Sequence, residues 1–501
     1  MKRTNLRQSL LYGTLIGSVF FASLAGAQTT AQDLPKSIHQ KIQALNLSPD
    51  EVSIWVKPLD GQAPIISHHA KTLRVPASTQ KLITTLVALD SLGANHHWYT
   101  HIYKKGVVVA GTLYGDIVIK GTGDPSLTHE RLRALFGHLF VRGIRHIQGD
   151  ILVDNGAFFG VNFDVNAFDG YGLRAYNAAP NALLVNFGTL QIDIVPSGTY
   201  HTSAQMDKTG QPVQVFVPAD NRLAMLKVVP TLADFDVPNT IGASAGACQS
   251  EPKFGLSPTA LKVSGIISAA CGHNTRWLTF ANGDEFALKA IKGTWQQFDP
   301  SFAGEVKLYA ATLSSLALPV VSYPSRALAA QIYDINQYSN NVMTEQVALS
   351  LPLSVGETIS TYPKAFAFIN HWWKTHLNSP APVMSRASGL CRDCQVSPSA
   401  MGELLEFAYR QPYFSTFKHS LPIAGRTGTM ARLAYRNPNH PAIERAFIKT
   451  GTLDDVVSMA GYVVDSQGRY YVVVGMINAP HASGRGAVSV LDELLAVVAQ
   501  Y

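Results

Sequence analysis

Residues 78–92 read STQKLITTLVALDSL, a stretch that combines a helix signal with a serine and a lysine three positions apart. Its apolar residues recur at helical spacing, the run stops at Gly93, and Pro76 precedes it. Ser78 should therefore lie near the start of a helix. Positions i and i+3 share one helix face, so Lys81 can reach the hydroxyl of Ser78.

The chemistry of this pair is that of a serine nucleophile with a lysine base. A serine hydroxyl attacks poorly until a neighbour takes its proton, and lysine can do so if a crowded, partly dry site lowers its pKa. Chance alone supplies roughly one or two SxxK strings in a chain of this length. Two others occur, but Ser250 to Lys253 contains Pro252, and Ser415 to Lys418 comes too late in the chain.

Ser339-Asn340-Asn341 is the second motif, and it interrupts an otherwise helical stretch. A short loop between helices can present Ser339 as a proton relay. Asn341 would then offer an amide that both donates and accepts hydrogen bonds toward a peptide substrate. The tripeptide is weak evidence alone, since Ser and Asn are common at helix boundaries.

Lys449-Thr450-Gly451 is the third motif, and it follows the strand-like run Ala446-Phe447-Ile448. Thr450 should point to the opposite face of the strand from Lys449, and Gly451 would let a substrate backbone lie close. The cation, the hydroxyls of Thr450 and Thr452, and a bare strand edge would suit a carboxylate-ended peptide. Lys208-Thr209-Gly210 matches too, but Gln211-Pro212 follows it as in a surface turn. Arg426-Thr427-Gly428-Thr429 is a near match within a loop.

Composition indicates a large, exported, globular protein. The chain has 501 residues, 47% hydrophobic and 15% charged, enough for two to four domains. Residues 1–27 carry three basic residues, a mostly apolar run and the end Ala25-Gly26-Ala27, so we expect a signal peptide cleaved before Gln28. An uncleaved anchor would need about 20 apolar residues, and this run is shorter and broken by glycines.

Net charge argues against nucleic acid as a partner. Cleavage of the leader lowers the formal net charge from +6 to 37 − 34 = +3, and no basic stretch interleaved with aromatics follows. The four cysteines of an exported chain suggest disulfides, with three possible connectivities. Proximity favours Cys248 with Cys271 and Cys391 with Cys394. A zinc site from all four, or a redox-active Cys391-x-x-Cys394 dithiol, are the alternatives.

The order of segments predicts an α+β protein built as a split domain with a long insertion. Strand and hairpin patterns fill residues 105–195, short β-like runs continue to 291, helical patterns return after Tyr323-Pro324, and three strands and an amphipathic segment end the chain. We expect a main domain of residues 28–100 and 317–501, with an antiparallel sheet flanked by helices. Inserted β-rich domains would comprise residues 101–195 with 292–316, and residues 196–291.

The chain resembles the penicillin-recognising serine enzymes, with their β-lactamase/transpeptidase-like domain. Within them it is similar to the D-alanyl-D-alanine carboxypeptidase/endopeptidases of the penicillin-binding protein 4 type, the class C low-molecular-mass group. Ser78 and Ser339 are 339 − 78 = 261 positions apart, where that family carries two inserted β domains. Further family-like strings are Lys120 to Pro125, Gly149-Asp150, Tyr176 to Pro180, Ser388-Gly389-Leu390, Val396-Ser397-Pro398 and Leu421 to Gly425.

This resemblance implies an acyl-enzyme on Ser78, with Lys81 as its base, and peptidoglycan stem peptides, their cross-links and β-lactam antibiotics as reactants. It implies that Ser339 and Asn341 assist proton transfer and orientation, and that Lys449, Thr450, Gly451 and Thr452 bind substrate. The N–H groups of Ser78 and Thr452 would form the oxyanion hole. Arg392, Tyr176 and Asp169 would contact the donor side chain. The sequence departs from the pattern at Cys391, Cys394 and Asp454, which affects side-chain preference.

Two other functions remain open at this stage. A β-lactamase shares the motifs, but no Glu motif for fast deacylation is present, and the long insertion argues against it. A non-catalytic wall-binding scaffold would have no need of intact Ser78, Lys81 and Lys449. We predict no cofactor and no metal site, since the pairs His68-His69 and His96-His97 point apart on a strand or a helix. We also predict a periplasmic protein without a transmembrane segment after cleavage, and we leave open a homodimer.

Overall fold

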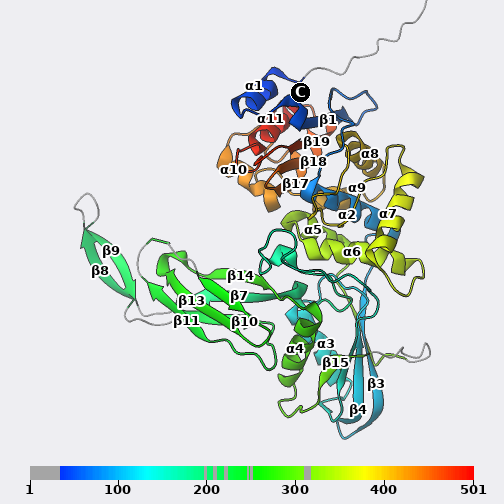
Figure 1. The fold of residues 1–501 in the computed structure, drawn as a ribbon, viewed down its shortest axis with the longest axis vertical. Helices are drawn as coiled ribbons and strands as arrows, with labels where there is room; N and C mark the ends of the chain where they lie inside the picture. The colour runs from blue at the N-terminus through cyan, green and yellow to red at the C-terminus, as the bar shows by residue number, and fades with distance from the viewer. Residues whose placement is uncertain are drawn as a thin grey trace, which may run out of the picture.

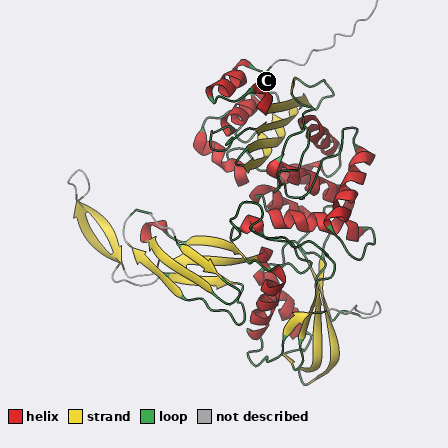
Figure 2. Ribbon diagram, viewed as in Figure 1, coloured by secondary structure: helices red, strands yellow, loops and turns green. Residues whose placement is uncertain are grey.

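The computed structural model describes residues 34–196, 200–206, 212–218, 224–244, 247–248, 252–309 and 318–501. The predicted signal peptide, the Lys208-Thr209-Gly210 string and Ser250 lie outside these residues. Figure 1 shows an elongated molecule with a helix-rich domain at the top and two strand-rich lobes below it. Figure 2 shows the same division by secondary structure.

The centre of the upper domain, which we call the main domain, is a five-stranded antiparallel sheet. Its order is β17-β18-β19-β1-β2, so β17 is an edge strand. The strands are β1 (Val52–Pro58), β2 (Ile66–His68), β17 (Ala446–Leu453), β18 (Val456–Val464) and β19 (Tyr470–Asn478). β17, β18 and β19 are the three strands predicted from the sequence.

Both faces of this sheet are buried, which explains its apolar strands. On β18, Met459 and Val463 face a core with α1 (Lys36–Ala44) and α11 (Val488–Ala499). Ala460 and Tyr462 face the opposite core, under the remaining helices of the main domain. These helices are α2 (Lys81–Leu92), α5 (Leu328–Tyr338), α6 (Asn341–Ser354), α7 (Tyr362–His376), α8 (Pro398–Tyr409) and α9 (Phe414–Ser420), and the short α10 (Arg432–Arg436) lies near the β17 edge.

Segments from the two ends of the chain pair in the sheet of the main domain. β1 pairs with β19 along its whole length, with Val52 opposite Ile477 and Pro58 opposite Tyr471. The terminal segment forms α11, as predicted, and the turn around residues 466–468 joins β18 to β19. The predicted α+β class with an antiparallel sheet flanked by helices is confirmed.

The first of the two lobes contains a mixed six-stranded sheet. Its strands follow the path β15-β6-β4-β3-β16, and β5 lies beside β4. Two helices pack on it, α3 (His129–Val141) and α4 (Gly283–Gln296). The strands are β3 (Tyr99–Val109), β4 (Thr112–Lys120), β5 (His146–Ile147), β6 (Ile151–Asp154), β15 (Val306–Leu308) and β16 (Val321–Pro324). Neither helix was predicted from the sequence, although in α3 the buried residues Leu132, Leu135, Phe136 and Leu139 lie at helical spacing.

The second lobe is a smaller module with its own core around Ile192, Ile241 and Val263. Its sheets run β10-β7-β14 and β11-β13-β12, with a separate β8-β9 hairpin. The strands are β7 (Thr189–Val195), β8 (Tyr200–Met206), β9 (Pro212–Pro218), β10 (Met225–Val229), β11 (Asn239–Ser244), β12 (Lys253–Leu256), β13 (Leu261–Ser268) and β14 (Asn274–Thr279). We retain the domain division as a proposal with three changes. β7, predicted in the first inserted domain, belongs to this second lobe, and α4 belongs to the first lobe. β16, predicted in the main domain, pairs with β3 in the first lobe.

The cysteines form the two disulfides favoured by the sequence. Cys248 is bonded to Cys271 with a Cα–Cα distance of 4.6 Å, and Cys391 is bonded to Cys394 with a Cα–Cα distance of 5.6 Å. The zinc alternative is therefore excluded, because all four thiols are engaged. Among the described residues, every helix is too short or too polar to cross a membrane.

Candidate active site

Ser78 lies in a single 3₁₀ turn, η2 (Ala77–Gln80), that leads directly into α2, so its predicted place at a helix start is confirmed. The residue before it, Ala77, has a φ of 48°, a left-handed conformation that costs energy for a residue with a side chain. Gly389 lies against this turn. A Cβ on Gly389 would come within 1.9 Å of the Ala77 carbonyl oxygen, so only glycine fits there.

Lys81 is fully buried and donates to three oxygens. Its Nζ lies 2.9 Å from Ser78 Oγ, 2.7 Å from Asn341 Oδ1 and 2.6 Å from the Ser388 carbonyl oxygen. Burial, followed by repulsion from Lys449, holds the pKa of Lys81 well below its usual value, whereas Glu345 acts in the opposite direction. The lowered pKa makes it easier for Lys81 to lose its proton, as a general base must before it can accept one from the serine hydroxyl.

Ser339 and Asn341 occupy the junction of two helices, as the sequence predicted. α5 ends at Tyr338, Ser339 adopts a left-handed φ of 58°, and Asn340 caps α6 by accepting from the Met343 N–H. The sharp turn directs Asn341 toward Lys81, while its Nδ2 donates to the Tyr176 carbonyl oxygen at 2.9 Å. The second motif thus meets the first.

Lys449 is also fully buried, on edge strand β17. Its Nζ donates to Ser339 Oγ at 3.0 Å and to the Thr450 carbonyl oxygen at 2.8 Å. Burial lowers the pKa of Lys449 to about 7. Burial lowers the pKa of both lysines, and their positive charges repel each other. An anion bound between them would relieve this repulsion.

The β17 strand passes close to the nucleophile. A Cβ on Gly451 would lie 2.4 Å from Ser458 Oγ and 2.8 Å from the Ser78 nitrogen. Thr450 donates to Thr429 Oγ1 at 2.7 Å, and Thr452 is exposed. The strand continues beyond Lys449 to Leu453, so all three residues after the lysine lie along one extended edge.

Tyr176 and Asp169 form a hydrogen-bonded pair in the segment of residues 163–178, next to Asn341. Tyr176 Oη donates to Asp169 Oδ2 at 2.5 Å, and burial followed by this carboxylate raises the pKa of Tyr176 to about 12. Partial burial acts to raise the pKa of Asp169, but hydrogen bonds from Tyr176, the Tyr171 N–H and Asn177 outweigh it and lower that pKa. The pair therefore holds a negative charge next to the cleft.

Arg392 lies at the rim, more than half exposed. It is 3.7 Å from Asp455 and stacks over the Phe168 ring at 5.3 Å. The Cys391–Cys394 disulfide encloses it in a short loop. Asp454 contacts His481 at 3.0 Å and is exposed, away from the lysines.

Glu345 is the residue that sequence reasoning missed most clearly. Its buried carboxylate accepts from the Ala387 N–H at 3.0 Å and from the Ser388 N–H at 2.9 Å, so it fixes the carbonyl that receives Lys81. Glu345 is four positions after Asn341 in α6, which places both on one helix face, and this spacing could have revealed it. The string Arg426-Thr427-Gly428-Thr429 was interpreted as a loop without a role in the site. Its last residue, Thr429, nevertheless accepts a hydrogen bond from Thr450.

Several of these residues line a cleft of about 290 Å³ between the main domain and the 163–178 segment, among them Tyr176, Asn341, Glu345, Ser388 and Arg392. Behind Asn341 lie the Ser78 hydroxyl and Lys81 with its lowered pKa, and the Ser339 hydroxyl contacts Lys449 on the edge strand β17. Such an arrangement can transfer an acyl group from a carboxylate-ended peptide to serine. It defines a serine acyl-transfer enzyme of the β-lactamase/transpeptidase-like class.

Comparisons with known proteins place the chain within that class. Residues 34–498 match the D-Ala-D-Ala carboxypeptidase 3 (S13) family. The chain is 23% identical over 479 residues to D-alanyl-D-alanine carboxypeptidase DacB of Haemophilus influenzae, covering 94% of this chain and 92% of DacB. It is 24% identical to a D-alanyl-D-alanine carboxypeptidase of Actinomadura sp. (strain R39), covering 85% of this chain and 77% of that protein.

Among solved structures, penicillin-binding protein 4 from Haemophilus influenzae matches with a TM-score of 0.70 at 20% identity, over 93% of this chain and 99% of that chain. The same protein complexed with a β-lactam matches at 0.66 and 18% identity, over 92% and 99% of the two chains. These likenesses show the fold. The chain belongs to the D-Ala-D-Ala carboxypeptidase S13 family, and the resemblance drawn from its motifs is confirmed.

Proposed function

We propose that this protein is a serine D-alanyl-D-alanine carboxypeptidase and endopeptidase that acts on peptidoglycan stem peptides through an acyl-enzyme on Ser78. The observation that carries this proposal is the contact of Lys81 Nζ with Ser78 Oγ at 2.9 Å, in a site where burial lowers the pKa of the lysine. Family membership supports the same reaction.

In the proposed acylation, Lys81 takes the proton of Ser78 and the serine oxygen attacks the carbonyl of the penultimate D-alanine. The N–H groups of Ser78 and Thr452 stabilise the oxyanion. The bond to the leaving amine then breaks, and the proton returns to that amine through Ser339, which lies 3.0 Å from Lys449. Water hydrolyses the ester in a second round of base catalysis.

Substrate recognition divides between the two walls of the cleft. Lys449, Thr450 and Thr452 hold the terminal carboxylate, while Gly451 lets the peptide backbone run along β17. Arg392, Tyr176 and Asp169 face the donor side chain from the other wall. A cleavage of cross-links follows the same chemistry, with the amine of a neighbouring stem peptide as the leaving group.

The setting we propose is the periplasm, after removal of residues 1–27. The two disulfides support an oxidising compartment, and β-lactams would acylate Ser78 because they resemble the D-alanyl-D-alanine end. A homodimer stays a prediction.

Intact-protein mass spectrometry after incubation with benzylpenicillin tests the proposal, with Ser78→Ala as the matched control. A stable adduct of one penicillin on the wild type and none on the variant supports it. An unmodified protein with intact penicillin would favour a scaffold. An unmodified protein with consumed penicillin would identify a β-lactamase.

A further inference from the structure

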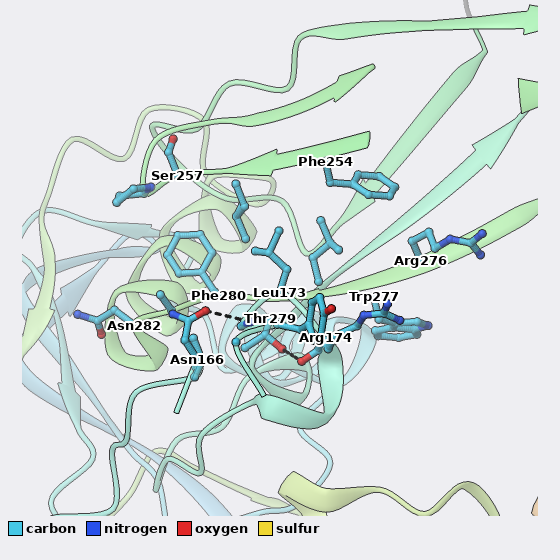
Figure 3. A pocket seen from close by; sticks show the side chains of 18 of the residues that line it. Asn166, Leu173, Arg174, Phe254, Ser257, Arg276, Trp277, Thr279, Phe280 and Asn282 are labelled. Carbon is cyan, nitrogen blue, oxygen red and sulfur yellow. Dashed lines mark hydrogen bonds between the residues drawn. The ribbon is translucent and has the colours of Figure 1, made fainter. Parts of the chain in front are cut away.

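A second hollow, larger than the cleft, lies on the other side of the 163–178 segment. Its volume is about 680 Å³, and Val165 lines both hollows. Figure 3 shows it between this segment, β14 and the residues that follow β12. A hollow of this size accepts a ligand as large as a disaccharide or a short peptide.

The walls of this hollow, which we call the β14 pocket, are mostly apolar. Phe254, Leu173 and Phe280 line it, and the Trp277 ring is 38% exposed at one side. Flat aromatic faces and aliphatic side chains suit the apolar faces of sugar rings and the methyl groups of small side chains.

The charges of the β14 pocket favour an anion. Arg174 and Arg276 line it and are exposed, against one carboxylate, Glu285. Guanidinium groups bind carboxylates with paired hydrogen bonds. The ligand that fits this wall therefore has an apolar or sugar body and a free carboxylate.

A continuous series of contacts joins the β14 pocket to the nucleophile. The Thr279 N–H donates to the Leu173 carbonyl oxygen at 3.0 Å, and Thr279 Oγ1 donates to the Arg174 carbonyl oxygen at 2.7 Å. The Asn177 N–H also donates to that Arg174 oxygen, at 2.9 Å, across the 3₁₀ turn η3 (Ala175–Asn177).

The middle residue of η3 is Tyr176, whose carbonyl oxygen accepts from Asn341 at 2.9 Å. Asn341 Oδ1 in turn accepts from Lys81 at 2.7 Å. A ligand that presses residues 173–174 against β14 would thereby fix Tyr176, and fixed Tyr176 would orient Asn341 toward the base.

We infer that the β14 pocket binds a muropeptide, a sugar with a short carboxylate-bearing peptide, and that its occupancy speeds acylation of Ser78 through residues 173–177. The inference rests on the proposed function, because a wall polymer that enters the cleft carries such units on both sides of the reacting peptide. The ligand would be a neighbouring unit of that polymer.

The binding test uses the mature chain with Ser78 acylated by benzylpenicillin, so that the cleft is filled. The probe is muramyl dipeptide, which has a sugar, a short peptide and a free carboxylate but no D-alanyl-D-alanine bond. We expect saturable binding by calorimetry. Trp277→Ala and Arg276→Ala should each weaken it about ten-fold or more. Tyr114→Ala removes an exposed aromatic ring from β4 and should bind like the wild type.

Absence of binding, equal binding by Trp277→Ala, or equal binding of uncharged N-acetylglucosamine would overturn the inference. Each variant must first take up one penicillin, which shows that its cleft is folded. A wild type without any adduct would overturn the proposed function instead, so the two failures are distinguishable.

The coupling test measures the rate at which a fluorescent penicillin acylates the free enzyme. Muramyl dipeptide should raise this rate about five-fold or more in the wild type. It should leave the rate of Thr279→Val unchanged, because valine keeps the shape of threonine but cannot donate to Arg174. An equal acceleration in Thr279→Val, or a slower rate in the wild type, would overturn the coupling.

Discussion

Replacing Lys449 with methionine should stabilise the main domain at acid pH while it abolishes the reaction. Lys449 is fully buried, and burial lowers its pKa from 10.5 to about 7. Keeping this lysine charged in the folded protein therefore costs about 5 kcal/mol. Its hydrogen bonds to Ser339 and Thr450 recover part of that cost, so we expect Lys449→Met to gain about 2 kcal/mol at pH 6.

The stability difference between Lys449→Met and the wild type should depend on pH. Between pH 7 and 10.5 the unfolded chain binds a proton at Lys449 that the folded chain releases, so wild-type stability rises with pH across that window. By pH 10 the penalty has nearly vanished and only the lost hydrogen bonds remain. The variant should then be slightly less stable than the wild type, so the difference changes sign.

Urea unfolding followed by tryptophan fluorescence at pH 6 and pH 10 measures this difference, because four of the six tryptophans lie in the main core. Lys104→Met, on the exposed part of β3, is the matched control and should show no change of sign. A Lys449→Met protein that is less stable than the wild type at both pH values would refute the reasoning.

Three further variants test the site. Glu345→Gln should slow acylation of Ser78 about 30-fold, since it weakens one charged hydrogen bond of about 2 kcal/mol. It should also move the acid limb of the rate profile to lower pH, because Glu345 raises the pKa of Lys81; a limb that stays or moves up contradicts this. Gly451→Ala should cut the acylation rate at least about 100-fold and lower the unfolding midpoint, because its Cβ would lie 2.8 Å from the Ser78 nitrogen. A near-normal rate would show that β17 can move away from Ser78 to make room for the added methyl group. The double serine variant of Cys391 and Cys394 should raise KM more than it lowers kcat, measured on a stem pentapeptide; a loss confined to kcat would place the disulfide's effect on the base instead.

The sequence predicted the parts of the site that depend on short motifs. Ser78 and Lys81 are three positions apart on one turn, and Ser339 lies in a helix junction, so local rules sufficed for both. The three C-terminal strands also followed from their apolar runs. The order of the motifs along the chain, together with the resemblance, indicated that the three would meet.

What the sequence did not reveal depends on contacts between distant segments. The helical spacing from Asn341 could have drawn attention to Glu345, but its hydrogen bonds from the Ala387 and Ser388 N–H groups join segments more than 40 positions apart, which no local pattern indicates. Helix α3 was not predicted for a different reason. It is a single short helix between segments with clear strand patterns, β3 and β4 before it and β5 and β6 after it. The place of β7 in the second lobe follows from its pairing with β10 and β14, which only the folded chain determines.

The pairing of β1 with β19 has a consequence for the order of events during synthesis. Val52 and Ile477 are opposite each other across 477 − 52 = 425 positions, so the central sheet cannot close until nearly the whole polypeptide has emerged. Closing so long a loop is slow, whereas hairpins such as β3–β4 and β18–β19 can form from neighbouring residues. A chain that is cut short before β19 therefore lacks the partner strand of β1, and its central sheet stays incomplete.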